Sequence, residues 1–78
     1  MFNRRKQGNN LSWFGTGSEY REKLADLNQA CLSLGLATSG VYRDVNAEDP
    51  EDRLYSLTVW IPKREQEHLE WMHDRLMK

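Results

Sequence analysis

The chain has only 78 residues, and its single cysteine, Cys31, leaves it without an intrachain disulfide. A chain this short buries roughly 60% of the surface that its unfolded form exposes, so it can build one small domain at most. The core must therefore hold by packing alone. A lone cysteine also gives no sign of an oxidising compartment, and we expect a cytoplasmic protein.

The longest helical pattern lies between residues 16 and 36. Thr16 and Glu19 fit a capping box, which predicts a helix that begins near residue 17. Gly35 fits the left-handed position that follows a helix, with Leu36 as its hydrophobic partner. Between these signals, apolar residues recur at spacings of 4, 3, 4 and 3 and define one helical stripe: Tyr20, Leu24, Leu27, Cys31 and Leu34.

Two strands and a second helix are predicted for the rest of the chain. Residues 37–45 favour an extended strand, and residues 53–61 alternate in a way that indicates a half-buried one. The expected core side of that second strand consists of Tyr55, Leu57, Val59 and Ile61. The intervening turn residues predict an antiparallel hairpin with a long loop. Pro62 favours the start of a helix over residues 63–77, with Leu69, Met72 and Leu76 on one stripe.

The order helix, strand, strand, helix predicts an α+β fold in which two helices cover an antiparallel hairpin. An isolated hairpin is marginal in water and leaves both edges unpaired. We therefore expect a homodimer whose two hairpins form a four-stranded sheet. Residues 13–78 would form the domain, and residues 1–12 a flexible basic tail.

Charge is distributed unevenly along the chain. Residues 1–10 carry three cations, Arg4, Arg5 and Lys6, and no acid, whereas the remaining residues carry eight cations and twelve acids. A domain that binds duplex nucleic acid normally gathers an excess of cations on one face, and this body lacks that excess. There is neither a signal-peptide pattern nor an apolar run of about 18 residues, so no membrane association is expected.

The sequence offers no convincing catalytic, cofactor or metal motif. His68 and His73 are five residues apart and would point about 140° away from each other on a helix. Cys31 lies on the buried stripe, where a free cysteine usually acts as a small hydrophobe, so a Cys–His nucleophilic pair is disfavoured. Gly15 and Gly17 lack the remaining residues of a phosphate-binding loop. We expect no catalytic residue, cofactor or metal.

Three tryptophans in so small a chain cannot all be interior, so we expect at least one to be partly exposed. Trp13, next to Phe14, is expected to form a hydrophobic flap over the core. Trp60 lies on the strand face opposite the core, where it would anchor a partner or pack in a dimer seam. Trp71 lies beside His68 and Arg75 at helical spacing, and such clusters are common interface anchors.

A run of carboxylates surrounds the loop between the two predicted strands. Such runs are usually solvated, but they also present a negative patch to basic surfaces. The run consists of Asp44, Glu48, Asp49, Glu51 and Asp52.

Two functions of different classes follow. The first is a small non-enzymatic protein-binding module that docks an aromatic face and an acidic edge on a larger, partly basic protein or nucleoprotein complex. Accessory regulators and inhibitors from bacteria and their mobile elements, including phages, are often of this kind. The alternative is a nucleic-acid-binding accessory protein in which Arg4, Arg5 and Lys6 contact phosphate while Trp60 and Tyr42 or Tyr55 stack on bases.

Overall fold

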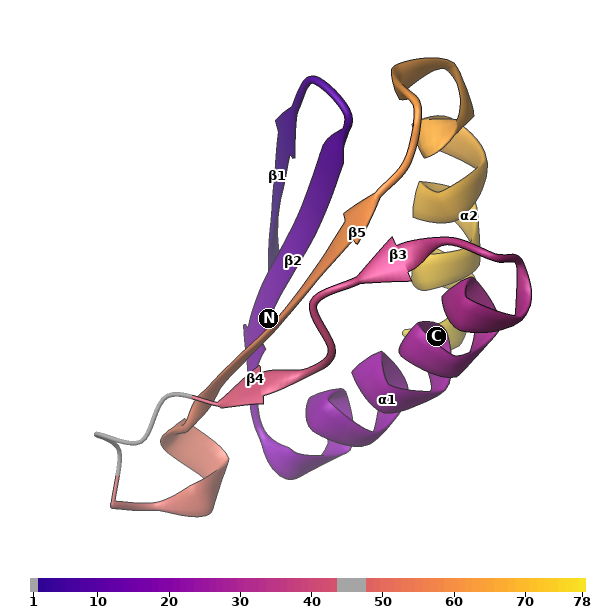
Figure 1. Ribbon diagram of the computed structural model, residues 1–78. Helices are drawn as coiled ribbons and strands as arrows, with labels where there is room; N and C mark the ends of the chain where they lie inside the picture. The colour runs from indigo at the N-terminus through magenta and orange to yellow at the C-terminus, as the bar shows by residue number, and fades with distance from the viewer. Residues whose placement is uncertain (1, 44–47) are drawn as a thin grey trace.

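The computed structural model describes residues 2–43 and 48–78, which form an antiparallel sheet of five strands and two α-helices (Figure 1). The strands lie in the order β1-β2-β5-β3, and β4 also pairs with β5. The predicted α+β class is confirmed. The elements are β1 (Phe2–Gln7), β2 (Asn10–Thr16), α1 (Ser18–Ser33), β3 (Ala37–Thr38), β4 (Tyr42–Arg43), β5 (Leu54–Trp60) and α2 (Gln66–Leu76), with 3-10 turns at Pro50–Asp52 and Lys63–Glu65.

The N-terminal segment differs from the flexible tail expected over residues 1–12, because it holds β1 and the start of β2. Gly8, at φ 58°, occupies the first central position of a two-residue turn, which is typical of a type II′ hairpin. The turn is attached to the rest of the fold: Gln66 Nε2 donates to the carbonyl oxygen of Gly8 at 2.7 Å, and Ile61 N donates to that of Asn9 at 2.8 Å. These contacts join residues far apart in the chain, so the local sequence could not predict that this segment is ordered.

The predicted end of helix α1 agrees with the structure, but the predicted start does not. The capping box is wrong, because Gly17 is the N-cap and no side chain caps the first turn. The glycine-based end is confirmed. Gly35 has a φ of 80°, and the N–H groups of Gly35 and Leu36 donate to the carbonyls of Leu32 and Cys31, each at 3.0 Å. This pair of hydrogen bonds is a Schellman motif.

The predicted strand over residues 37–45 is interrupted. Two short strands, β3 and β4, flank Gly40, whose φ is 75°. Ser39 bridges the interruption, because its N–H donates to the Thr58 carbonyl at 2.9 Å while its Oγ accepts from the Thr58 N–H at 3.1 Å. The antiparallel pairing with the second predicted strand is confirmed. Residues 44–47, including Asp44, lie outside the described residues.

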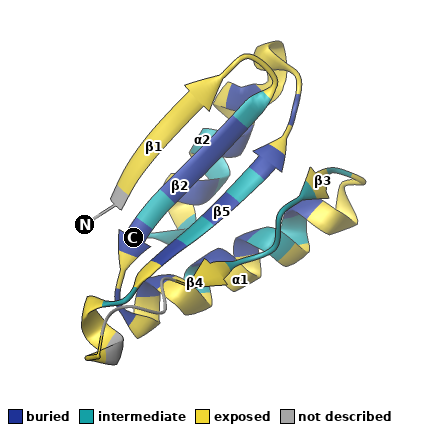
Figure 2. Ribbon diagram, turned by 60° about the vertical axis from the view of Figure 1, so that its left-hand side comes forward, coloured by how far each residue is buried: buried dark blue, intermediate teal, exposed yellow. Residues whose placement is uncertain are grey.

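Both helices cover the same face of the sheet, and the other face carries no helix (Figure 1). Figure 2 shows β1 exposed from Asn3 onward, while buried residues recur along β2 and β5. The predicted core side of β5 is confirmed. Leu11 and Trp13 of β2 face the same side, because the register pairs them with Val59 and Leu57. Trp13 is wholly buried and not a flap. The core consists of Leu11, Trp13, Tyr20, Leu24, Leu27, Cys31, Tyr55, Leu57, Val59, Ile61 and Leu69.

One chain supplies all five strands, so pairing between two copies is not needed to build the sheet. The edge strand β1 carries Arg4, Arg5 and Lys6, and cations on an edge strand oppose pairing with an identical strand. The fold therefore gives no support to the edge-paired, four-stranded dimer that the sequence suggested.

Substitution of Gly15 by alanine is expected to destabilise the protein by about 1–3 kcal/mol, the usual cost of overpacking. A Cβ at Gly15 would lie 2.4 Å from Cε2 of the Tyr20 ring, which is buried and cannot easily move. Urea unfolding followed by circular dichroism measures the effect. The neighbouring exposed Thr16→Ala variant is the control and should change stability by less than about 0.5 kcal/mol. Equal stability of the two variants would contradict this close packing.

Candidate interaction surfaces

The face of the sheet that no helix covers is called the open face below. Its side chains alternate with those of the core along each strand and are paired across the strands by the register. Large side chains are exposed on it: Tyr42 is 63% exposed, Trp60 46% and Leu54 40%. The open face comprises Asn3, Arg5, Gln7, Asn10, Ser12, Phe14, Thr16, Ala37, Tyr42, Leu54, Ser56, Thr58 and Trp60.

The open face carries apolar, hydroxyl and amide side chains, and Arg5 is the one charged side chain that the register places on it. The Arg5 guanidinium carbon lies 5.8 Å from the centroid of the Phe14 ring, a cation–π contact. Near the centre of the face, the hydroxyls of Ser12 and Thr58 hydrogen-bond to each other at 2.8 Å. A hollow of about 300 Å³ on this face is lined by Phe14, Tyr42, Arg43, Leu54 and Ser56.

A second exposed aromatic group lies on α2 and is called the Trp71 surface. The His68 ring lies 6.0 Å from the Trp71 ring, with 20° between the planes, and the Arg75 guanidinium carbon lies 4.9 Å from it. Trp71 is 54% exposed. The predicted cluster of these three side chains is confirmed. Beside it lies an apolar hollow of about 310 Å³, lined by Trp71, Arg75, Asp26, Ala30, Met72 and Leu76.

Trp60 and Trp71 do not belong to one site. Trp60 lies on the open face, whereas Trp71 lies on a helix that covers the opposite face. The sequence grouped them as candidate partner-binding residues, because position in a strand and position in a helix do not reveal which side of the sheet the helix takes. The structure thus gives two separate aromatic surfaces.

The acidic loop lies next to the start of α1. Ser18 Oγ donates to Glu51 Oε1 at 2.6 Å, and the Glu51 N–H donates to Asp49 Oδ1 at 3.0 Å. Glu48 and Asp52 are exposed. From this point a row of exposed carboxylates follows α1 at spacings of three and four, Glu19, Glu22 and Asp26, and its last member lines the hollow beside Trp71.

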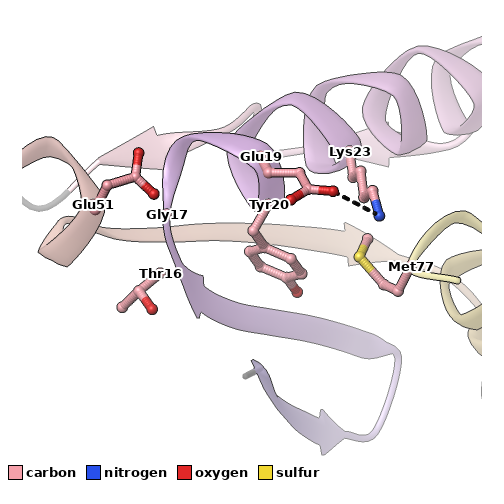
Figure 3. Close-up of a pocket in the computed structure, with 7 residues that line it drawn as sticks. All are labelled: Thr16, Gly17, Glu19, Tyr20, Lys23, Glu51 and Met77. Carbon is pink, nitrogen blue, oxygen red and sulfur yellow. Dashed lines mark ion pairs between the residues drawn. The ribbon is translucent and has the colours of Figure 1, made fainter.

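A hollow of about 450 Å³ also opens at the start of α1 (Figure 3). Glu19 and Glu51 contribute carboxylates to its lining, and the single ammonium, Lys23, lies 3.5 Å from Glu19. Two carboxylates beside one paired cation do not favour a phosphate, even at a helix N-terminus. The hollow therefore does not support a phosphate-binding loop at Gly15 and Gly17.

The three N-terminal cations point to different sides of the sheet. Arg4 and Lys6 reach Glu70 on α2, the Arg4 Nη1 at 3.7 Å from Glu70 Oε2, while Arg5 lies on the open face. Tyr55, proposed to stack on bases, is only 3% exposed. The three cations therefore do not form one row of phosphate contacts, and Tyr55 is not available to stack on a base.

His73 occupies the core, which the sequence did not foresee. Its ring stacks on Trp13 at 4.7 Å with 5° between the planes. Tyr20 Oη lies 3.0 Å from His73 Nε2, and Asp74 Oδ1 lies 3.1 Å from Nδ1. A neutral imidazole protonated on Nδ1 satisfies both bonds, donating to Asp74 and accepting from Tyr20. His73 follows the buried residues Leu69 and Gln66 by four and seven positions, which places all three on one side of α2. This spacing was the sequence signal that could have predicted its burial.

Burial shifts the pKa values of three ionisable groups in the core. It raises the pKa of the Cys31 thiol to about 11 and raises that of the Tyr20 hydroxyl well above its usual value, so both stay protonated near neutral pH. It lowers the pKa of His73, an effect that Asp74 opposes and Arg4 reinforces. In residues 2–43 and 48–78, no three His, Cys, Asp or Glu side chains are placed to hold a metal ion.

Comparison of the chain with models of protein families, with curated proteins and with solved structures found no match. Within the described part of the chain, neither helix has the length and apolar character required to cross a bilayer. The function is therefore inferred from the two surfaces themselves.

Proposed function

We propose that this protein is a small non-enzymatic binding module that docks its Trp71 surface on a larger, partly basic protein. The observation that carries the proposal is the continuity between the row of carboxylates on α1 and the apolar hollow beside Trp71, where Asp26 belongs to both. Such a module would act as a regulator or inhibitor of that protein, or of the nucleoprotein complex containing it.

The composition of the Trp71 surface supports a protein partner. Tryptophan and arginine are the residues most often found at the energetic centre of protein interfaces, and here they are stacked on each other. The stack fixes the Trp71 ring before binding, which lowers the entropy lost when a partner covers it. The hollow at its side offers space for an apolar side chain of the partner.

The acidic row supports a partner with basic residues near its apolar contact. Glu19, Glu22 and Asp26 lie on one stripe of α1, and Glu51 continues it beyond the start of the helix. A basic surface would be steered toward this row over about one Debye length, roughly 8 Å in physiological salt. We expect the association rate to fall as salt rises, while the apolar contact sets the dissociation rate.

The test is capture of a partner by immobilised protein from a bacterial lysate, with and without nuclease, followed by titration of the captured protein. We expect Trp71→Ala to weaken its affinity at least tenfold, about 1.4 kcal/mol, because the ring is the anchor of the surface. The charge-reversed Glu22→Lys/Asp26→Lys variant should reduce association and its dependence on salt.

Trp60→Ala is the matched control, since Trp60 is an equally large, half-exposed ring on the opposite side of the molecule. A captured protein whose affinity for a single docking site is the same in wild type and Trp60→Ala but lower in Trp71→Ala supports the proposal. Equal capture by Trp71→Ala, or capture that disappears with nuclease, contradicts it and favours the nucleic-acid alternative.

A further inference from the structure

The open face presents an unusual surface for an exposed side of a sheet. Of its thirteen side chains only Arg5 is charged, and no carboxylate of residues 2–43 and 48–78 lies on it. At the same time Tyr42, Leu54 and Trp60 are all at least 40% exposed. Large apolar groups gathered on one face indicate a surface that another molecule covers.

We propose that a second copy of this chain covers the open face, so that two sheets pack face to face in a homodimer. A face without carboxylates, whose two nearby cations Arg5 and Arg43 lie on the outer strands β1 and β4, packs against itself with little repulsion between like charges. Arg5 lies on the edge strand β1, at the rim of the contact, where its guanidinium group can stay hydrated while it remains over Phe14. Partners of opposite charge, in contrast, would find little to pair with.

Two hydroxyls near the centre of the face already bond to each other within the chain. Ser12 and Thr58 bond to each other through their hydroxyls, and the Thr58 N–H donates to Ser39 Oγ. Burying a hydroxyl without a partner is costly, whereas a pair that is already bonded loses little when water leaves. The Ser12–Thr58 pair can thus be covered by an apolar surface without a donor or acceptor from the other molecule.

The size of the open face suits a weak dimer. Strands of seven residues, β2 and β5, are about 23 Å long, and four neighbouring strand positions span about 19 Å with their side chains. The projected area of the face is then on the order of 400 Å² per chain, or roughly 800 Å² in total, which is the size of a weak, transient contact. We therefore expect a dissociation constant in the micromolar range.

Face-to-face packing differs from the edge pairing suggested by the sequence. In this dimer the helices lie on the outside, so two Trp71 surfaces face away from each other and stay free. The inference goes beyond the proposed function, because it concerns the purified chain alone. If both hold, the dimer is bivalent, and it would bind a partner with two or more docking sites far more tightly than a monomer does.

Sedimentation equilibrium of the purified full chain between about 1 and 200 µM, a range that brackets the expected micromolar constant, tests the proposal. We expect a monomer–dimer equilibrium that moderate salt does not weaken. Trp60→Glu and Tyr42→Glu should each raise the dissociation constant at least tenfold, because each replaces a large exposed ring of the contact with a charge. Trp71→Glu is the matched control and should leave the constant unchanged.

Circular dichroism of each variant confirms folding, and the milder Trp60→Ala and Tyr42→Ala variants should weaken the dimer in the same order if a charged variant unfolds. A monomer at every concentration overturns the proposal. So does a dimer that Trp71→Glu disrupts while Trp60→Glu preserves it, or one that salt strengthens steeply, as edge pairing of two cationic β1 strands would require.

Discussion

Replacement of Trp13 by alanine is expected to destabilise the protein by about 3–5 kcal/mol, the cost of removing a large aromatic side chain from a packed core. Trp13 is 0% exposed, and its ring stacks on His73 at 4.7 Å. Domains of this size are stable by only about 5–15 kcal/mol, so the variant should unfold at much lower urea concentration. Far-ultraviolet circular dichroism measures this without relying on tryptophan fluorescence.

Trp13→Phe separates the contribution of the ring from that of its polar atom. Trp13 Nε1 is buried, and no hydrogen-bond partner for it is found among the described residues. Phenylalanine keeps an aromatic ring against His73 and removes this unsatisfied N–H, so we expect a cost below about 1.5 kcal/mol. Trp71→Ala, on the surface, should cost less than about 0.5 kcal/mol. If Trp13→Ala were as stable as Trp71→Ala, the central position of Trp13 would be refuted.

The stability of the protein should fall between pH 7 and pH 5 because of His73. Burial lowers the pKa of this imidazole below its unfolded value of about 6.5; Asp74 raises it and Arg4 lowers it further, with burial the largest effect. In this pH range the unfolded state binds more protons than the folded state, so acid favours unfolding. The stability is fully present above pH 6.5 and is lost as the pH falls toward the folded-state pKa, with a slope of at most about 1.4 kcal/mol per pH unit.

Urea unfolding of wild type and His73→Gln at pH 7 and pH 5 tests this. Glutamine retains an acceptor for the Tyr20 hydroxyl but does not titrate, so the variant should lose less stability on acidification than wild type does. His68→Gln removes the exposed histidine beside Trp71 and should behave as wild type. An unchanged pH dependence in His73→Gln would show that His73 is not the group responsible.

The elements that depend on local pattern were predictable. The apolar stripe of α1, its glycine-based end and the alternation along β5 each repeat with the period of one secondary structure, so the sequence predicts them directly. The position of Trp71 between His68 and Arg75 was predictable for the same reason, since it depends only on the geometry of one helix.

The elements that depend on distant partners were not predictable. β1 is exposed along its described side chains and has no alternating apolar pattern, and it is a strand because β2 pairs with it and Gln66 holds its turn. The capping box at Thr16 had the right residues, but Thr16 is the last residue of β2 and pairs with Leu54, so the helix begins one residue later with Gly17 as its N-cap. Local propensity is overruled where a long-range contact offers a better partner.

By itself the sequence determined that this chain folds as an α+β domain without a disulfide, with its longest helix closed by Gly35 and one strand buried on the side of Leu57. Only the tertiary structure decided that Trp13 and His73 meet in the core and that Trp60 and Trp71 lie on opposite sides of the molecule. Periodicity fixes which side chains share a face of one element. Which face of the sheet the helices cover depends on packing between residues far apart in the chain, and that choice leaves the open face free.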